Sequence, residues 1–347
     1  MNNLHRKISS AIKDNQTVIA QDILERIYKN YSRDENKSKS LRDIHYHLDY
    51  LTEAIATSNP ELFSEYIAWV SALFSKLNLA KNVLELTLAC TEEALKEHFN
   101  HEEFAVVKEY LDLATEKLRK GIQMPPIFIN PHLPLGGLAK EYLDALLRAD
   151  RQAASRMIIE AVSSGTPIKD IYMHVFQKSQ HEIGRLWQLN EVSVAQEHYC
   201  TAATQLVMSQ LYPYLFSESK NGKKMIATSI GGELHEIGMR MVADFFEMDG
   251  WDTYYIGANT PNQSIIQTLE ENEAQLLGIS ATLTPHISAV ENLISQIRST
   301  EFGKNVKILV GGYPFNIAPR LWEDIGADGY GRDANEAVSI AKTLINA

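Results

Sequence analysis

Cysteine is nearly absent from this chain, which has only two in 347 residues. Cys90 and Cys200 lie far apart without paired spacing, so the sequence excludes a disulfide framework and a cysteine-based zinc site. Long apolar runs are also absent: no stretch approaches the roughly 20 residues that span a bilayer, and no signal-peptide core follows the N-terminus. We therefore predict a cytoplasmic protein with no membrane segment and with both cysteines in its core.

Basic residues are in deficit, with 33 Lys and Arg against 44 Asp and Glu. A chain with this balance is repelled by phosphate backbones, so we predict no direct binding to nucleic acid. The length predicts two or three domains of about 100 to 150 residues each.

Strand signals and glycine-rich turns are nearly absent from residues 1–122. Apolar residues recur three to four positions apart there, as in Leu62 to Val70, and a break at 32–39 separates the opening helix from the next. This pattern predicts a bundle of about five helices, a sensory or partner-binding domain without an assignable residue role. Prolines and glycines at 123–137 predict a stiff linker, and residues 138–218 predict four more helices.

Strands and helices alternate in the last part of the chain, residues 223–347. Buried-strand patterns occur near 224–229, 252–256, 275–280, 306–310 and 328–330. Alternation at this spacing predicts a five-stranded parallel sheet covered by helices, a Rossmann-like, flavodoxin-like domain. The fold class is therefore multidomain, α followed by α/β.

One histidine follows the first of these strands. Glu233, His235 and Gly238 lie in the loop between that strand and a helix, where doubly wound sheets bind ligands. A histidine binds a metal better when a carboxylate holds its second ring nitrogen, and Glu233 can supply that contact. Ser280 ends the third strand, and Gly311 and Gly312 end the fourth.

Together these residues resemble the cobalamin-binding fold of methionine synthase, corrinoid mutases and related carriers. The family motif is Asp-x-His-x-x-Gly, then Ser-x-Leu, then Gly-Gly at comparable spacing; here Glu233 replaces Asp, and Thr282 stands where Leu is common. The resemblance implies that the cofactor is cobalamin and that His235 is the lower axial ligand of its cobalt. It implies cofactor contacts for Glu233, Glu236, Ile237, Gly238, Ser280, Thr282, Gly311 and Gly312.

The helical segment 138–218 carries a second resemblance. Trp187 precedes the pair Glu197 and His198 by ten positions, which is similar to the helical cap of light-sensing cobalamin-dependent regulators of the CarH type. This implies that Trp187 packs on an adenosyl group, that Glu197 bonds to it and that His198 lies close by. Gln188 stands where the best-known sensors have a histidine, and their MerR-type DNA-binding domain is not recognisable in residues 1–122.

The leading hypothesis is an adenosylcobalamin light sensor, not itself an enzyme, that signals through its N-terminal domain or its oligomeric state. Two alternatives remain: a corrinoid methyl carrier that serves a methyltransferase, with methylcobalamin as the cofactor form, or a light-insensitive cobalamin or redox sensor that acts as an anti-repressor. The expected partners are cobalamin, a protein bound through the N-terminal domain, and further copies of the chain.

Overall fold

The computed structural model describes residues 3–30, 37–77, 79, 82–215 and 219–346. The chain divides into two compact units, which are described separately. The first contains residues 1–123, 281–298 and 310–330, and the second contains residues 124–280, 299–309 and 331–347. The domain boundaries of the sequence analysis stay a prediction.

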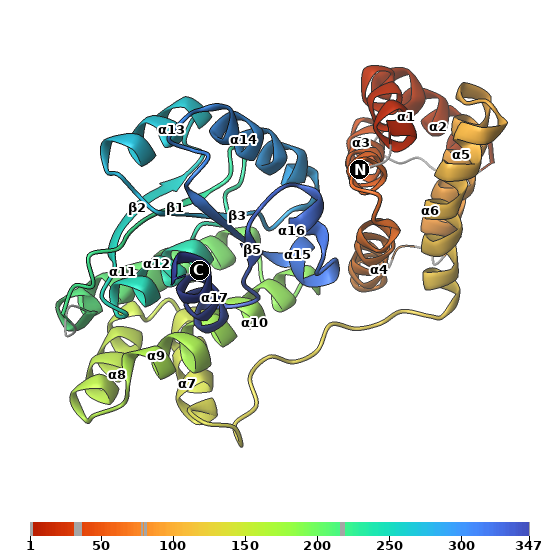
Figure 1. The fold of residues 1–347 in the computed structure, drawn as a ribbon. Helices are drawn as coiled ribbons and strands as arrows, with labels where there is room; N and C mark the ends of the chain where they lie inside the picture. Colours follow the sequence, from red (N-terminus) through yellow and green to blue (C-terminus); the bar gives the residue numbers. More distant parts are fainter. Residues whose placement is uncertain (1–2, 31–36, 78, 80–81, 216–218, 347) are drawn as a thin grey trace. The chain divides into compact units, whose positions relative to one another are not determined.

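The N-terminal region is entirely helical where the structure describes it. Its helices are α1 (Asn3–Asp14), α2 (Gln16–Asn30), α3 (Lys37–Ala56), α4 (Pro60–Lys76), α5 (Asn82–His98) and α6 (His101–Arg119) (Figure 1). The predicted count of five is wrong because the opening helix is two: the side chain of Asn15 donates to the carbonyl of Ala11 at 2.9 Å, where α1 ends. Of the predicted break, residues 32–36 lie outside the described part, and 37–39 are helical.

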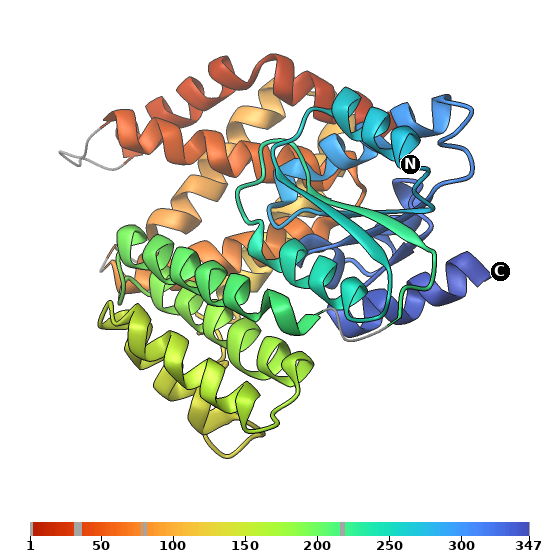
Figure 2. The ribbon, with the colours of Figure 1, turned by 90° about the vertical axis from the view of Figure 1, so that its left-hand side faces the viewer.

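A second group of helices follows the linker. They are α7 (Gly136–Leu147), α8 (Arg151–Ser163), α9 (Ile168–Asp170), the π-helix η1 (Ile171–Phe176), α10 (Gln177–Gln188) and α11 (Val194–Leu215). Because α9, η1 and α10 run on without a break, they form one of four long helical segments, as predicted, and these pack side by side (Figure 2). We call this group the helical cap. Cys200 lies buried within it, as predicted, and Cys90 is buried in the N-terminal region.

The end of the linker is fastened to α10. The main-chain N–H of Phe128 donates to Oε2 of Glu182 at 2.9 Å, and its ring lies edge-on to that of His181, with centroids 5.1 Å apart. Arg185 pairs with the other oxygen of Glu182 at 2.6 Å. Glu182 is buried, and its carboxylate therefore has both a charged partner and a main-chain donor.

The sheet has five strands, as predicted: β1 (Lys224–Ser229), β2 (Asp252–Ala258), β3 (Leu276–Ser280), β4 (Lys307–Gly311) and β5 (Gly329–Tyr330). Their order is β2-β1-β3-β4-β5, and β1 runs parallel to both of its neighbours. All but the first residue of β1 are buried, as expected for a central strand covered on both faces.

Helices connect these strands. They are α12 (Ile237–Glu247), α13 (Asn262–Glu271), the 3₁₀-helix η2 (Thr284–His286), α14 (Ile287–Ser299), α15 (Tyr313–Ile317), α16 (Leu321–Asp324) and α17 (Ala334–Asn346). Figure 1 shows α12 and α17 together on one side of β1 and β2, with α13 on the other side. No helix among the described residues is both long enough and apolar enough to cross a membrane.

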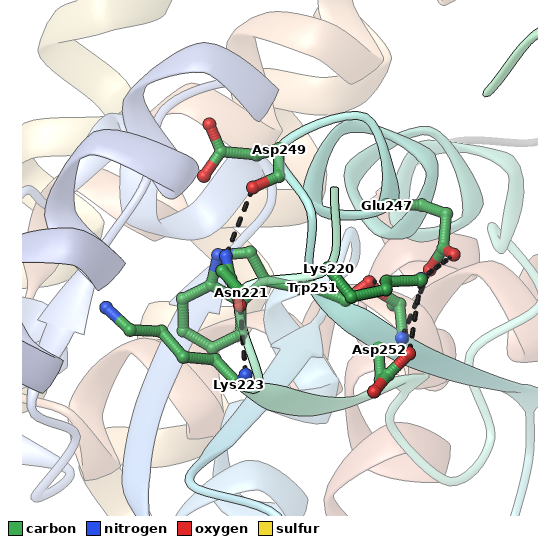
Figure 3. Close-up of polar contacts among 8 residues, drawn as sticks. Lys220, Asn221, Lys223, Glu247, Asp249, Trp251 and Asp252 are labelled. Atoms are coloured by element: carbon green, nitrogen blue, oxygen red, sulfur yellow. Dashed lines mark hydrogen bonds and ion pairs between the residues drawn. The ribbon is translucent and has the colours of Figure 1, made fainter. Parts of the chain in front are cut away.

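A polar cluster holds the segment that enters β1 (Figure 3). The ammonium group of Lys220 pairs with Glu247 and, at 3.2 Å, with Asp252. The side-chain amide of Asn221 donates to the carbonyl of Asp249 at 3.1 Å. These contacts join the chain before β1 to the turn between α12 and β2. They lie at the amino end of β1, so they support the sheet and leave its carboxyl end free for a site.

A partly buried carboxyl joins the cap to the sheet domain. The hydroxyl of Tyr172, in η1, donates to Oδ2 of Asp244, in α12, at 2.7 Å. Burial raises the pKa of Asp244 from 3.8 to about 6, although the bond from Tyr172 and the charge of Arg240 oppose this. The folded state therefore favours the protonated acid more strongly than the unfolded state does.

The contribution of Asp244 to the free energy of unfolding should for this reason fall by about 2 to 3 kcal/mol as the pH rises from about 4 to about 6. Above that pH this contribution should stay level. We expect Asp244→Asn, which keeps an acceptor for Tyr172, to remove this loss. Urea unfolding of the wild type and of Asp244→Asn at several pH values between 4 and 8 measures this loss. The reasoning is wrong if the difference in unfolding free energy between the two proteins does not change with pH.

Candidate functional site

The loop after β1 presents an imidazole held by a buried carboxylate. Nδ1 of His235 lies 2.5 Å from Oε1 of Glu233, and the main-chain N–H of His235 donates to the same oxygen at 3.0 Å. The side chain of Glu233 is fully buried, whereas 57% of the His235 side chain is exposed. In the neutral ring, this contact places the proton on Nδ1 and leaves the lone pair of Nε2 available to a ligand.

The protonation of His235 depends on nearby carboxylates. The hydrogen bond to Glu233 raises the pKa of His235 above its ordinary value of 6.5, against the opposing effect of burial, and the charge of Glu197 raises it further. Glu197 belongs to the helical cap, so the cap contributes negative charge to the surroundings of the imidazole. A cation at Nε2, whether a proton or a metal, is stabilised by this charge.

Two serines at strand ends help to hold the loop that carries His235. The hydroxyl of Ser229, at the end of β1, lies 2.9 Å from the hydroxyl of Ser280, at the end of β3, and 3.3 Å from the carbonyl of His235. The main-chain N–H of Ile230 donates to the carbonyl of Ser280 at 3.0 Å. Ser280 is thus linked to the loop that carries His235. The sequence analysis singled out Ser280 but missed Ser229, whose only signal is a polar side chain at the end of an apolar strand.

The glycine pair at the end of β4 permits a close approach of two backbones. Gly312 has φ of +117°, and a Cβ added there would lie 1.9 Å from the carbonyl oxygen of Ala281. The carbonyl of Gly311 accepts from the N–H of Ala281 at 3.0 Å. Since β3 and β4 are neighbours in the sheet, this contact packs the two strand ends together. The fold itself therefore requires Gly312. Thr282 is partly buried just beyond this contact.

Gly238, by contrast, is not required by the fold. It is the second residue of α12, and a Cβ there would meet nothing within 4 Å. A glycine in a helix costs roughly 0.5 to 1 kcal/mol relative to alanine. An exposed glycine three residues after His235 is explained if a ligand must approach the backbone closely.

We therefore expect Gly238→Ala to leave the thermal stability of the protein without ligand unchanged or slightly raised, and to weaken ligand binding by at least about 10-fold, since a misplaced methyl group in a tight contact costs on the order of 1 to 3 kcal/mol. Thermal unfolding and ligand titration separate the two effects. Unchanged affinity would show that no ligand approaches Gly238.

The cap residues singled out from the sequence lie on two successive helices. Trp187, near the end of α10, is 39% exposed. Glu197, in the first turn of α11, has its two oxygens near Nδ1 of His198, at 2.5 Å, and the hydroxyl of Thr201, at 3.2 Å. Glu197 and His198 therefore contact each other, and their contacts with an adenosyl group stay a prediction. Gln188 is buried.

The residue after His235 has partners that the sequence analysis missed. Oε1 of Glu236 accepts from the side-chain amide of Gln205, in α11, at 3.0 Å, and the hydroxyl of Tyr255, in β2, lies 3.3 Å from Oε2. No sequence signal pairs these residues, because they come from three elements. Ile237 begins α12. Among the described residues, no group of three or more His, Cys, Asp or Glu side chains could hold a metal ion.

Family models match three parts of the chain. Residues 138–212 and 223–339 each match a family described as a B12 binding domain. Residues 2–118 match a third family, described as Phycobilisome protein. The sequence analysis predicted only a helical domain in that region, because a helical pattern alone fits many families.

Several relatives are corrinoid proteins. The dimethylamine corrinoid protein of Methanosarcina barkeri is 30% identical over 198 residues, which cover 51% of this chain and 91% of the relative. Dimethylamine corrinoid protein 3 of Methanosarcina acetivorans is 25% identical over 60% of this chain and 97% of its own length. These relatives support the cobalamin-binding part of the resemblance and do not support its light-sensing part.

One solved structure shows the same fold. The monomethylamine corrinoid protein of Methanosarcina barkeri aligns with a TM-score of 0.55 and 22% identity, and the alignment covers 61% of this chain and all of that protein. The helical cap followed by a parallel sheet is therefore a fold that this chain shares with a corrinoid protein.

Proposed function

Because this chain belongs to the corrinoid protein family, we propose that it is a methyl-carrying corrinoid protein that serves a separate methyltransferase. One observation supports this most directly: the exposed imidazole of His235, held at 2.5 Å by the buried carboxylate of Glu233. This was the alternative in the sequence analysis, and the relatives favour it over the light sensor.

The residues of the site fit cobalamin. A corrin ring supplies four ligands to its cobalt, so one imidazole from the protein suffices below it. The open space at Gly238 accepts a close neighbour, and the small side chain of Ser280 leaves room at the sheet edge for a nucleotide tail. When bound, cobalamin supplies a cobalt that can accept and release a methyl group.

The chain's own residues would prepare this site. His235 would bind the lower face of the cobalt through Nε2, while Glu233 would keep the proton on Nδ1 and make the ring more basic. Ser229 and Ser280 would hold the loop in place through the carbonyl of His235. The helical cap would cover the upper face and exclude water. No turnover by this chain alone is implied, since the substrate would bind to the methyltransferase.

A labelled-methyl assay tests the proposal. The protein, loaded with cobalamin and reduced, is incubated with a methylamine methyltransferase and a radiolabelled methylamine. We expect close to one label per protein with the enzyme present and none without it. Failure to acquire label from any methylated amine, with the cofactor bound, would count against the carrier function.

The cap and the N-terminal region favour a second candidate, an adenosylcobalamin light sensor. Trp187 is partly exposed, Glu197 and His198 contact each other, and residues 2–118 match a family distinct from the B12 binding domains. For this candidate, the protein loaded with adenosylcobalamin should change its absorption and its sedimentation after illumination. Identical behaviour in light and dark would leave the carrier as the proposal. A protein partner at the N-terminal region, homo-oligomers and a cytoplasmic location stay predictions.

A further inference from the structure

Helix α11, part of the helical cap, contacts the loop that carries His235. The side-chain amide of Gln205, about two turns from the start of α11, donates to Oε1 of Glu236 at 3.0 Å. Glu236 is the next residue after His235. Glu197, in the first turn of the same helix, adds a negative charge that acts on His235. One helix therefore links the cap to the loop that carries the proposed lower ligand.

Several hydrogen bonds hold Glu236 in place. Besides the bond from Gln205, the hydroxyl of Tyr255 lies 3.3 Å from its Oε2 and 3.4 Å from its carbonyl oxygen. The carbonyl of Glu236 also accepts from the N–H of Arg240, in α12, at 3.0 Å. Both side chains that reach the carboxylate are partly buried, and hydrogen bonds to charged groups are stronger than those between neutral groups.

We propose that Gln205 is a positioning residue that couples the cap helix α11 to the orientation of His235. Between the backbone of His235 and the carboxylate that Gln205 holds lie ψ of His235, φ of Glu236 and the three side-chain torsions of Glu236, so fixing the carboxylate restricts the conformations open to the loop at His235. If that carboxylate is released, the loop loses its only described side-chain contact with the cap at Glu236. The inference rests on the proposed role of His235 as the lower ligand.

The chain offers a matched control for this contact. Arg240 donates to the hydroxyl of Ser209 at 2.8 Å, which joins the same two helices, α11 and α12, one turn further along. Ser209→Ala removes that bond without touching Glu236. A general loosening of the two helices would affect both variants, whereas a role in placing His235 affects only the change at Gln205.

The experiment uses the full chain loaded with cobalamin and reduced to cobalt(II). In protein whose histidines carry 15N, electron paramagnetic resonance then shows splitting into doublets by the ring nitrogen only in molecules whose imidazole is on cobalt, whereas the benzimidazole nitrogen of the cofactor itself gives triplets. We expect Gln205→Leu to lower the nitrogen-split fraction at least about threefold, Ser209→Ala to match the wild type, and Gln205→Lys, which can still donate to Glu236, to restore most of the signal. Tyr255→Phe, which removes the second support, should give a smaller loss.

The possible outcomes separate the two assignments. If the wild type shows nitrogen splitting and Gln205→Leu shows the same fraction, the coupling is wrong while the role of His235 stands. If the wild type lacks nitrogen splitting, the assignment of His235 is wrong and the coupling falls with it. If Gln205→Leu does not fold, Gln205→Lys and Tyr255→Phe decide: full splitting in Tyr255→Phe together with a loss in Gln205→Lys would overturn the inference.

Discussion

Replacing His235 with alanine is expected to remove the nitrogen ligand from the cobalt of the loaded protein. The absorption spectrum of the bound cofactor should lose the signature of an imidazole below the metal, and the splitting of the cobalt(II) signal by 15N-labelled histidine should disappear. Affinity for cobalamin should fall at least about 100-fold, since loss of even a supporting partner of a metal ligand typically costs 10-fold to 100-fold. Methyl transfer should fall with it.

Glu233→Gln is the matched control for this change. It leaves His235 in place and keeps an oxygen near Nδ1, but it removes the buried charge that raises the pKa of the imidazole. We expect this variant to retain nitrogen splitting with an affinity between those of the wild type and His235→Ala. If His235→Ala keeps a full nitrogen signal, the ligand is another residue and the assignment is wrong.

Gly312→Ala should have the largest effect on the fold itself. The added Cβ would lie 1.9 Å from the carbonyl oxygen of Ala281, and the φ of +117° is one that L side chains rarely adopt. Neither the strand end nor the backbone can yield without separating β3 from β4. We expect the free energy of unfolding to fall by about 3 to 5 kcal/mol or more, or the protein not to fold at all.

Gly137→Ala is the control, because Gly137 lies in the first turn of α7 and a Cβ there meets nothing within 4 Å. Its unfolding free energy should match or exceed that of the wild type. Urea unfolding of the proteins without cofactor gives both values. A loss at Gly312 no greater than about 1 kcal/mol would mean that the two strand ends are less tightly packed than the structure indicates.

The sheet domain was predictable because its signals are local and strong. Apolar strands such as Lys224–Ser229 are bounded by glycines and followed by amphipathic helices, so the five strands could be placed within about two residues. The count of N-terminal helices was not, because the break at Asn15 is a single residue with no proline or glycine. The π-helix η1 was missed for a related reason: it is only six residues long and lies inside a longer helical segment, so it barely changes the apolar pattern.

The candidate site likewise has a part that was predictable from the sequence and a part that was not. His235 and Glu233 are two positions apart, so their contact follows from local spacing. Ser229, Gln205 and Tyr255 come from a strand end, a cap helix and a second strand, and only tertiary packing brings them to the loop. The light-sensing hypothesis depended on the identity of cap residues, but the fold of the cap and the sheet is shared by a monomethylamine corrinoid protein.

The attachment of Phe128 to Glu182 sets the length of the tether between the N-terminal region and the cap. Helix α6 ends at Arg119, and the N–H groups of Lys120 and Gly121 still bond to carbonyls of its last turn, at 3.2 Å and 3.0 Å. The chain is held again at Phe128, so residues 122–127 form the span between the two attachments. Fully extended, the seven steps from Gly121 to Phe128 reach about 24 Å at roughly 3.4 Å per residue. However the two units are arranged, the end of α6 can lie no farther than this from Phe128 unless one of the two attachments opens.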